Sequence, residues 1–186
     1  MKAETAAKST RRGERGQSLV ELAISLTVML LLLAGAVTFG MALFSYVAIR
    51  DAAGEGALYG SIQPYHDTNL NGKYDAGEPV NGDYATGGIC QRVQNASDRP
   101  VNMSTFACTT NVYGSGGNNT GNKIDVSTTT VNPCEGTTGG NANGIQVTVD
   151  FDQPVFMPFM GAITGQQIHL RATVTDTILE PRCPGP

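Results

Sequence analysis

The longest hydrophobic run of the chain extends from Gly16 to Ile49 and contains one charged residue, Glu21, close to its beginning. About 20 predominantly apolar residues suffice for a helix to cross a bilayer. A helix also satisfies its own backbone hydrogen bonds, which lipid cannot do. The run therefore predicts a membrane-spanning helix, and we place the whole helix at residues 17–60.

Helical periodicity continues beyond the part of this run that a bilayer would cover. A set of apolar positions recurs at helical spacing: Val37, Met41, Phe44, Ala48 and Ala52. We expect this face to pack on a folded domain. Gly54 and Gly56 weaken the last turns, and Tyr59-Gly60 followed by Pro64 indicates the end of the helix.

Residues 61–186 form shorter patterned segments separated by loops rich in Gly, Asn and Thr. Apolar residues alternate from Ile145 to Phe151, which predicts a strand with one buried face, and residues 168–174 predict a last strand paired with it. Residues 101–113 and 124–131 predict two further strands, and residues 84–98 a short helix carrying Cys90 on its apolar face. The expected fold class is α+β, with the long helix packed on a small antiparallel sheet in one extracytoplasmic domain.

Charge is concentrated before the hydrophobic run. Residues 1–16 contain five basic residues against Glu4 and Glu14, a net charge of +3, whereas the whole chain carries −4. By the positive-inside rule, this leader stays in the cytoplasm and the domain after the helix is exported. We predict that the leader is disordered and is removed. Because no basic patch continues beyond Arg15, we expect no nucleic-acid partner.

The cysteine pattern agrees with export. The four cysteines, Cys90, Cys108, Cys134 and Cys183, all follow the hydrophobic run. An even number in an exported, loop-rich domain predicts two disulfides, and three pairings are possible. The chain has no CxxC pair, which argues against a zinc site.

The segment from residue 67 to residue 78, DTNLNGKYDAGE, matches the spacing of the EF-hand calcium loop. Gly72 stands where the backbone of such a loop must turn sharply. The predicted ligands are Asp67, Asn69, Asn71, Lys73 through its carbonyl, Asp75 and Glu78. An Asx-rich surface turn is the alternative. Pro79 argues against a second EF-hand helix, so we predict an isolated, structural Ca²⁺ site of weak affinity.

Catalytic motifs are missing from the sequence. His66 and His169 lie far apart without a motif around them, and we interpret His169 as solvent-facing. No G-x-S-x-G, H-E-x-x-H or phosphate-binding loop occurs. Asp150 and Asp152 fit surface positions at a strand end better than a catalytic pair. We therefore predict that the protein is not an enzyme.

The junction Arg15-Gly16-Gln17 and the helix after it resemble the N-terminal region of the TadE-like pilin family of tight-adherence, type IV-like pilus systems. The resemblance covers about 45 residues, RGQSLVELAISLTVMLLLLAGAVTFGMALFSYVAIRDAAGEGALYG. It departs at Gly54 and Leu58, where the family often has Arg. The matching positions are Arg15, Gly16, Gln17, Val20, Glu21, Phe39, Gly40, Tyr46, Asp51-Ala52-Ala53, Glu55-Gly56-Ala57 and Tyr59-Gly60.

This resemblance implies a pilin-like fold and cleavage by a prepilin peptidase after Gly16, which leaves Gln17 as the new N-terminus and Glu21 as the fifth mature residue. A carboxylate near lipid costs free energy, and the free amine of a neighbouring subunit could offset that cost and set the axial register. A local role remains open from the residues alone, since Ser18-x-x-Glu21 fits a capping box.

The resulting hypothesis is a pilin or minor pilin that leaves the cytoplasmic membrane and assembles, helix to helix, with copies of itself or other pilins into a surface fibre. The main alternative is a calcium-stabilised single-pass envelope protein or adhesin that stays in the membrane. A third possibility is a soluble module released by cleavage before Val37, since Ala34-Gly35-Ala36 resembles a signal-peptidase site.

Overall fold

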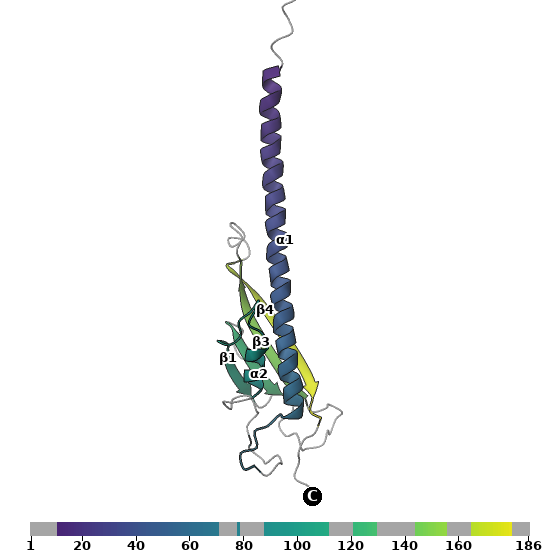
Figure 1. Cartoon of the computed structure of the whole chain (residues 1–186), viewed down its shortest axis with the longest axis vertical. Coiled ribbons are helices and arrows are strands. Elements are labelled where there is room, and N and C mark those ends of the chain that lie inside the picture. Colours follow the sequence, from purple (N-terminus) through teal and green to yellow (C-terminus); the bar gives the residue numbers. More distant parts are fainter. Residues whose placement is uncertain are drawn as a thin grey trace, which may run out of the picture.

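The structure is a computed structural model of the chain, and it describes residues 11–70, 78, 88–111, 121–129, 144–155 and 165–179. Two helices and four strands occur among them, in the order α1, α2, β1, β2, β3, β4. The α+β class predicted from the sequence is confirmed. Figure 1 shows a long helix whose first half extends well beyond a small domain built on its second half.

Helix α1 extends from Arg11 to Ile62 and has 52 residues, which corresponds to about 78 Å at 1.5 Å per residue. It begins before the predicted start at residue 17, so the prediction of a wholly disordered leader is wrong for residues 11–16. Arg and Glu are good helix formers and let the helix continue backwards from the apolar run. At the other end, the Gln63 N–H donates to the Tyr59 carbonyl at 3.0 Å, and Pro64 follows.

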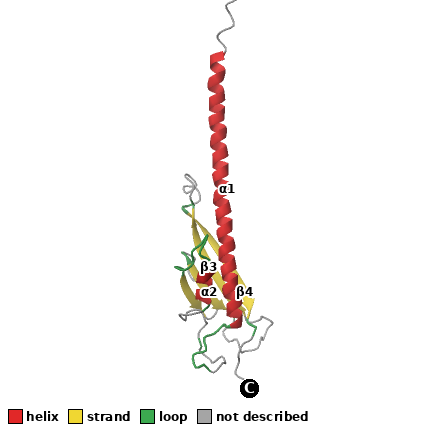
Figure 2. Cartoon of the chain, in the orientation of Figure 1, coloured by secondary structure: helices red, strands yellow, loops and turns green. Residues whose placement is uncertain are grey.

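The four strands form one sheet in the order β1-β2-β3-β4. Their bounds are Ala107–Asn111, Lys123–Thr128, Gly144–Pro154 and Gln167–Thr177. β3 pairs with β2 and β4 in antiparallel fashion, and the predicted pairing of the last two strands is confirmed by Val147 opposite Val174. Figure 2 shows the strands gathered beside the lower half of α1.

The sheet is mixed, because β1 runs parallel to β2. The prediction of a purely antiparallel sheet is wrong at this edge. Alternation of apolar residues identifies a strand but carries no information on its direction. A parallel pair requires only that the segment connecting the two strands returns to the end of the sheet where the first strand began. The strand predicted for residues 101–113 also begins later than expected, at Ala107, although Val101, Met103 and Phe106 before it are buried.

The core lies between one face of the sheet and the two helices. Helix α2, Ile89–Ala96, buries Ile89, Cys90 and Val93, which confirms the predicted apolar face of the short helix. α1 crosses β3 and β4 and also contacts α2, which reaches β2. Ile145 and Val147 of β3, both fully buried, face these helices.

The face of α1 that packs on the domain differs from the predicted one. Val37, Met41 and Phe44 remain exposed by 56%, 44% and 64%, whereas Ala52 is buried and Ala48 is partly buried as expected. The residues that pack are mostly small: Ala42, Ser45, Ile49, Ala52, Ala53, Gly56, Ala57 and Gly60. Small side chains bring the helix backbone close to the sheet. The larger apolar residues of the predicted face, Val37, Met41 and Phe44, instead point away from the sheet.

Candidate functional site

The first half of α1 is an apolar helical segment that the domain does not cover, and we call it the apolar rod. Within the described chain, the helix from Gly16 to Ile62 is long and apolar enough to cross a membrane, with a window of mean hydropathy 2.4 of which none is buried. Leu22, Leu26 and Leu33 are each more than half exposed. Apolar surface of this extent is unfavourable in water, so this part of the helix requires a bilayer or other helices around it.

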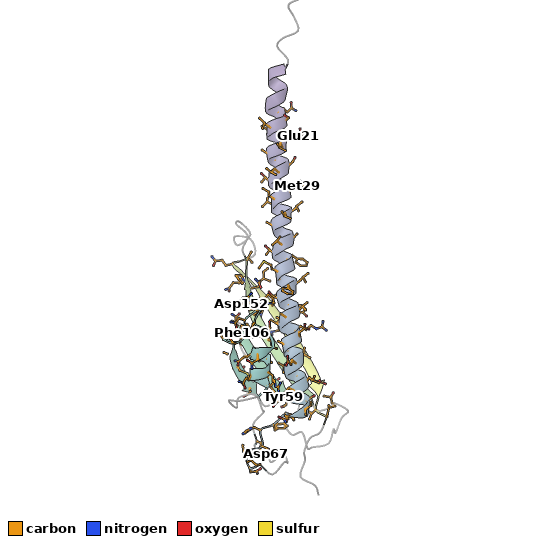
Figure 3. The ribbon with its side chains drawn as sticks, viewed as in Figure 1. Glu21, Met29, Tyr59, Asp67, Phe106 and Asp152 are labelled. Carbon is orange, nitrogen blue, oxygen red and sulfur yellow. A yellow bond between two sulfur atoms is a disulfide. The ribbon has the colours of Figure 1, made fainter. Side chains whose placement is uncertain are left out.

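Glu21 lies near the far end of this rod, well away from the domain, as Figure 3 shows by its distance along α1 from Tyr59. Its side chain is exposed and its carboxylate has no hydrogen bond or ion pair with another described residue. The Ser25 hydroxyl donates to the Glu21 backbone carbonyl at 2.8 Å and leaves the carboxylate untouched. The group is therefore available to a partner outside the chain.

The helix passes through Ser18 without interruption, because α1 begins at Arg11. Ser18 is therefore an interior helical residue in the intact chain, and the capping box that Ser18 and Glu21 could form requires a helix that begins beside them. Gly16, the predicted residue before the cleaved bond, has open space around its Cα, and no atom lies within 4 Å of where a Cβ would stand. Gly16 and Gln17 are exposed on the helix.

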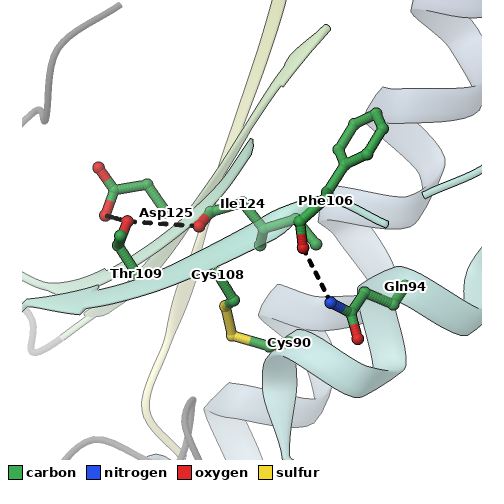
Figure 4. Close-up of a disulfide and its surroundings, with 7 residues drawn as sticks. All are labelled: Cys90, Gln94, Phe106, Cys108, Thr109, Ile124 and Asp125. Carbon is green, nitrogen blue, oxygen red and sulfur yellow. Dashed lines mark hydrogen bonds between the residues drawn. A yellow bond between two sulfur atoms is a disulfide. The ribbon is translucent and has the colours of Figure 1, made fainter. Parts of the chain in front are cut away.

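One disulfide is formed among the described residues. Cys90 of α2 is bonded to Cys108 of β1, with a Cα–Cα distance of 6.0 Å and a sequence separation of 18 (Figure 4). Beside it, the Gln94 side-chain amide donates to the Phe106 carbonyl at 3.0 Å. The bond fastens the short helix to the edge strand. Cys134 and Cys183 lie outside the described residues, and of the three possible pairings only the one joining these two remains compatible with two disulfides.

Within the predicted calcium loop, the structure describes residues 67–70 and residue 78. Glu78 is buried and accepts hydrogen bonds from the Thr68 N–H at 3.0 Å and from the Thr68 hydroxyl at 3.3 Å. The last predicted ligand thus lies against the residue that follows the first, Asp67. Asn69 is exposed, and three other predicted ligands, Asn71, Lys73 and Asp75, lie outside the described residues. Among the residues that are described, no group of three His, Cys, Asp or Glu side chains is placed to hold a metal.

A network of charged side chains, which the sequence did not reveal, crosses the outer face of the sheet. Asp150 is fully buried, so its interpretation as a surface residue at a strand end is wrong. β3 continues to Pro154, which puts Asp150 in mid-strand between Lys123 of β2 and Arg171 of β4. Arg171 donates to the carboxylate from Nε at 2.6 Å and from Nη2 at 3.0 Å, and Lys123 Nζ lies 3.8 Å away.

His169 extends this network towards Asp152. Its Nδ1 lies 2.8 Å from Asp152 Oδ1, and its Nε2 lies 3.3 Å from Asp150 Oδ1. The ring is 37% exposed, which agrees with the predicted solvent-facing position. Asp150 raises the pKa of Arg171 above its ordinary value, mainly through the side-chain hydrogen bond, while desolvation acts in the opposite direction. Arg171 therefore remains cationic throughout the usual pH range, and the network links β2, β3 and β4 through Asp150.

Together these features define an α+β protein with a bare apolar helix at one end and a small disulfide-bonded domain at the other. Residues 16–58, which lie within α1, match the family model described as "TadE-like protein". The resemblance noted in the sequence is confirmed over this helix. No curated protein and no solved structure matches the chain.

Proposed function

We propose that the chain is a structural pilin or minor pilin, processed by a prepilin peptidase after Gly16 and assembled through α1 into a type IV-like pilus for adhesion or surface contact. The observation that carries the proposal is the bare first half of α1 within the segment that matches the TadE-like family. Before assembly, the bilayer covers this apolar rod. In a fibre, the helices of neighbouring subunits would cover it instead.

Glu21 has a specific role in this proposal. A carboxylate on a lipid-facing helix costs roughly 2.5–3.5 kcal/mol at the bilayer centre and less near the interface. The side chain has no described partner within its own chain. Cleavage before Gln17 would create a free amine one helical turn away in sequence, and the amine of one subunit would then pair with Glu21 of the next. This pairing favours the assembled fibre over the membrane-bound monomer.

The first prediction concerns processing. We expect intact mass measurement and N-terminal sequencing of the protein from its native host to give a chain that begins at Gln17, and we expect sheared surface fibres to contain it. A chain that begins at Met1 and stays in the membrane fraction would favour the alternative, an envelope anchor or adhesin outside any fibre. A chain that begins at Val37 would contradict both and indicate a released soluble module.

We also propose that residues 67–78 bind Ca²⁺. Two observations support the site independently: the ligand spacing of the sequence, and the contact of Glu78 with Thr68, which brings the two ends of the segment together. A bound Ca²⁺ would take its oxygens from the six predicted ligands, with Glu78 supplying one or both carboxylate oxygens. Its contribution would be structural, because it would hold a segment that joins α1 to the remainder of the domain.

The second prediction follows from this site. Titration of the full chain in detergent with CaCl₂, followed by isothermal calorimetry, should give a Kd on the order of 10⁻⁴–10⁻³ M, since few carboxylates contribute. Glu78→Gln should weaken binding by at least about tenfold, because it removes a carboxylate from the first coordination sphere. Asp98→Asn, at an exposed position outside the segment, serves as the control and should bind as the wild type does. Equal binding by all three proteins would exclude the site.

A further inference from the structure

The second half of α1 carries an apolar ridge on the side that faces away from the sheet. At 100° per residue, four residues fall within about 60° of one another on the helix surface. These residues, which we call the outer ridge, are Leu43, Val47, Gly54 and Leu58. The three larger side chains are exposed by 49%, 51% and 57%. The packed face, which includes Ile49 and Gly56, lies on the other side of the helix.

A bilayer cannot cover this ridge. The hydrocarbon core is about 30 Å thick and accommodates about 20 helical residues. If the core begins at Leu22, just after Glu21, it ends near Met41. Leu58 then stands about 25 Å beyond it, at 1.5 Å per residue. The outer ridge therefore continues the apolar surface of the membrane half into the extracytoplasmic space, where its apolar side chains require another partner.

Charges of opposite sign flank the ridge. On the helix surface, Arg50 lies on one side of it, and Asp51 and Glu55 lie on the other side. All three are exposed, and none of them makes an ion pair with another described residue. Asp51 and Glu55 also stand four residues apart on one helix face, where like charges are mildly destabilising. A cation supplied by a partner would relieve that repulsion.

This charge pattern favours parallel over antiparallel packing of two α1 helices. When two helices lie parallel with their ridges in contact, opposite flanks meet, so that Arg50 of each helix faces the acidic flank of the other. In an antiparallel pair, like flanks meet, and Arg50 would face Arg50. Copies inserted through a membrane by the same basic leader are necessarily parallel. An axial offset of up to about 8 Å still places Arg50 level with Asp51 or Glu55.

We propose that the outer ridge is a contact between parallel α1 helices of two copies of this chain, outside the membrane, with Arg50 of one copy paired with Asp51 or Glu55 of the next. The inference rests on the proposed assembly and adds a second, charged contact to it. Continuity with the exposed membrane half, together with charge complementarity in the parallel orientation, identifies the occupant as a second copy. Gly54, with nothing within 4 Å of a Cβ position, lets the two helices approach closely.

The test is photo-crosslinking of the full chain in its native host, with two differently tagged copies expressed together. A photo-reactive amino acid at Val47 or Leu58 should produce a covalent product that carries both tags. The matched control replaces Thr175, which is exposed on the opposite, outer face of the sheet, and should produce none. A product with a different protein, or no product while wild-type chain is present in fibres, would overturn the inference and leave the proposed function intact. Absence of the wild-type chain from fibres would count against the proposed function itself.

Charge variants test the pairing. Arg50→Glu should lower the yield of the Val47 crosslink about fivefold to tenfold, because it turns attraction into repulsion at an exposed site. The triple variant Arg50→Glu, Asp51→Arg, Glu55→Arg exchanges the two flanks in every copy and should restore the yield. Circular dichroism of each variant verifies that the domain is folded, which is expected because all three side chains are exposed. Failure of the triple variant to restore the crosslink would contradict pairing between copies of the same chain.

Discussion

Replacement of Asp150 by Ala is expected to lower the free energy of unfolding of the domain by about 1.5–3 kcal/mol, because it removes a buried carboxylate that accepts charge-assisted hydrogen bonds from a partly exposed arginine. The Asp150 side chain is fully buried, with Arg171 in two-point contact and Lys123 at 3.8 Å. Without the carboxylate, Lys123 of β2 and Arg171 of β4 both lose the anion that stands between them on β3. Urea unfolding of the full chain in detergent, followed by hydrogen exchange of the β3 amides, measures the loss.

A neighbouring carboxylate supplies the control. Asp152 stands two residues further along β3, contacts the half-exposed ring of His169 and is itself 22% exposed. Asp152→Asn should therefore cost about 1 kcal/mol or less, as exposed charge pairs usually do. Asp150→Asn keeps the shape of the side chain and removes only its charge, so its loss of unfolding free energy should lie between the losses of the other two variants. If Asp150→Ala and Asp152→Asn have equal effects, the buried network does not stabilise the sheet as described.

Asp150 also illustrates why part of this structure could not be predicted from the sequence. Alternation along residues 145–151 was sufficient to predict the strand and its buried face, and the partner strand at residues 168–174 followed from the same pattern. The position of Asp150 opposite both Lys123 and Arg171 depends on the register of three strands. Register is set by pairing across the sheet, which the local pattern of one strand does not contain.

The candidate assembly site was more accessible to sequence reasoning. A carboxylate inside an apolar run and a basic-Gly-polar junction before it are features of consecutive residues, so Gly16, Gln17 and Glu21 could be selected without any tertiary contact. The outer ridge could not, because helical periodicity alone does not show which face of α1 the domain covers. Only the structure shows that the domain takes the face of small residues and leaves Leu43 and Val47 outside.

The second large effect is expected at Gly56, where substitution by Ala should destabilise the domain by about 1–3 kcal/mol through overpacking. A Cβ at this position would overlap Cγ2 of Val93 and would also lie 3.5 Å from side-chain atoms of Ile89 and Val147. Val93 is β-branched and has little rotamer freedom on a helix, and all three neighbours are fully buried. The helix would have to move away from α2 and β3 to accept the methyl group.

Gly54 is the matched control, because it undergoes the same change two residues earlier in the same helix. No atom lies within 4 Å of its Cβ position, so Gly54→Ala should only improve helix propensity and stabilise the chain by about 0.5–1 kcal/mol. Urea unfolding of the monomer in detergent should therefore shift in opposite directions for the two variants. Stabilisation by both would mean that glycine at position 56 only weakens the helix, as the sequence alone suggests. Opposite shifts would establish that Gly56 is required for the close contact between α1 and the rest of the core.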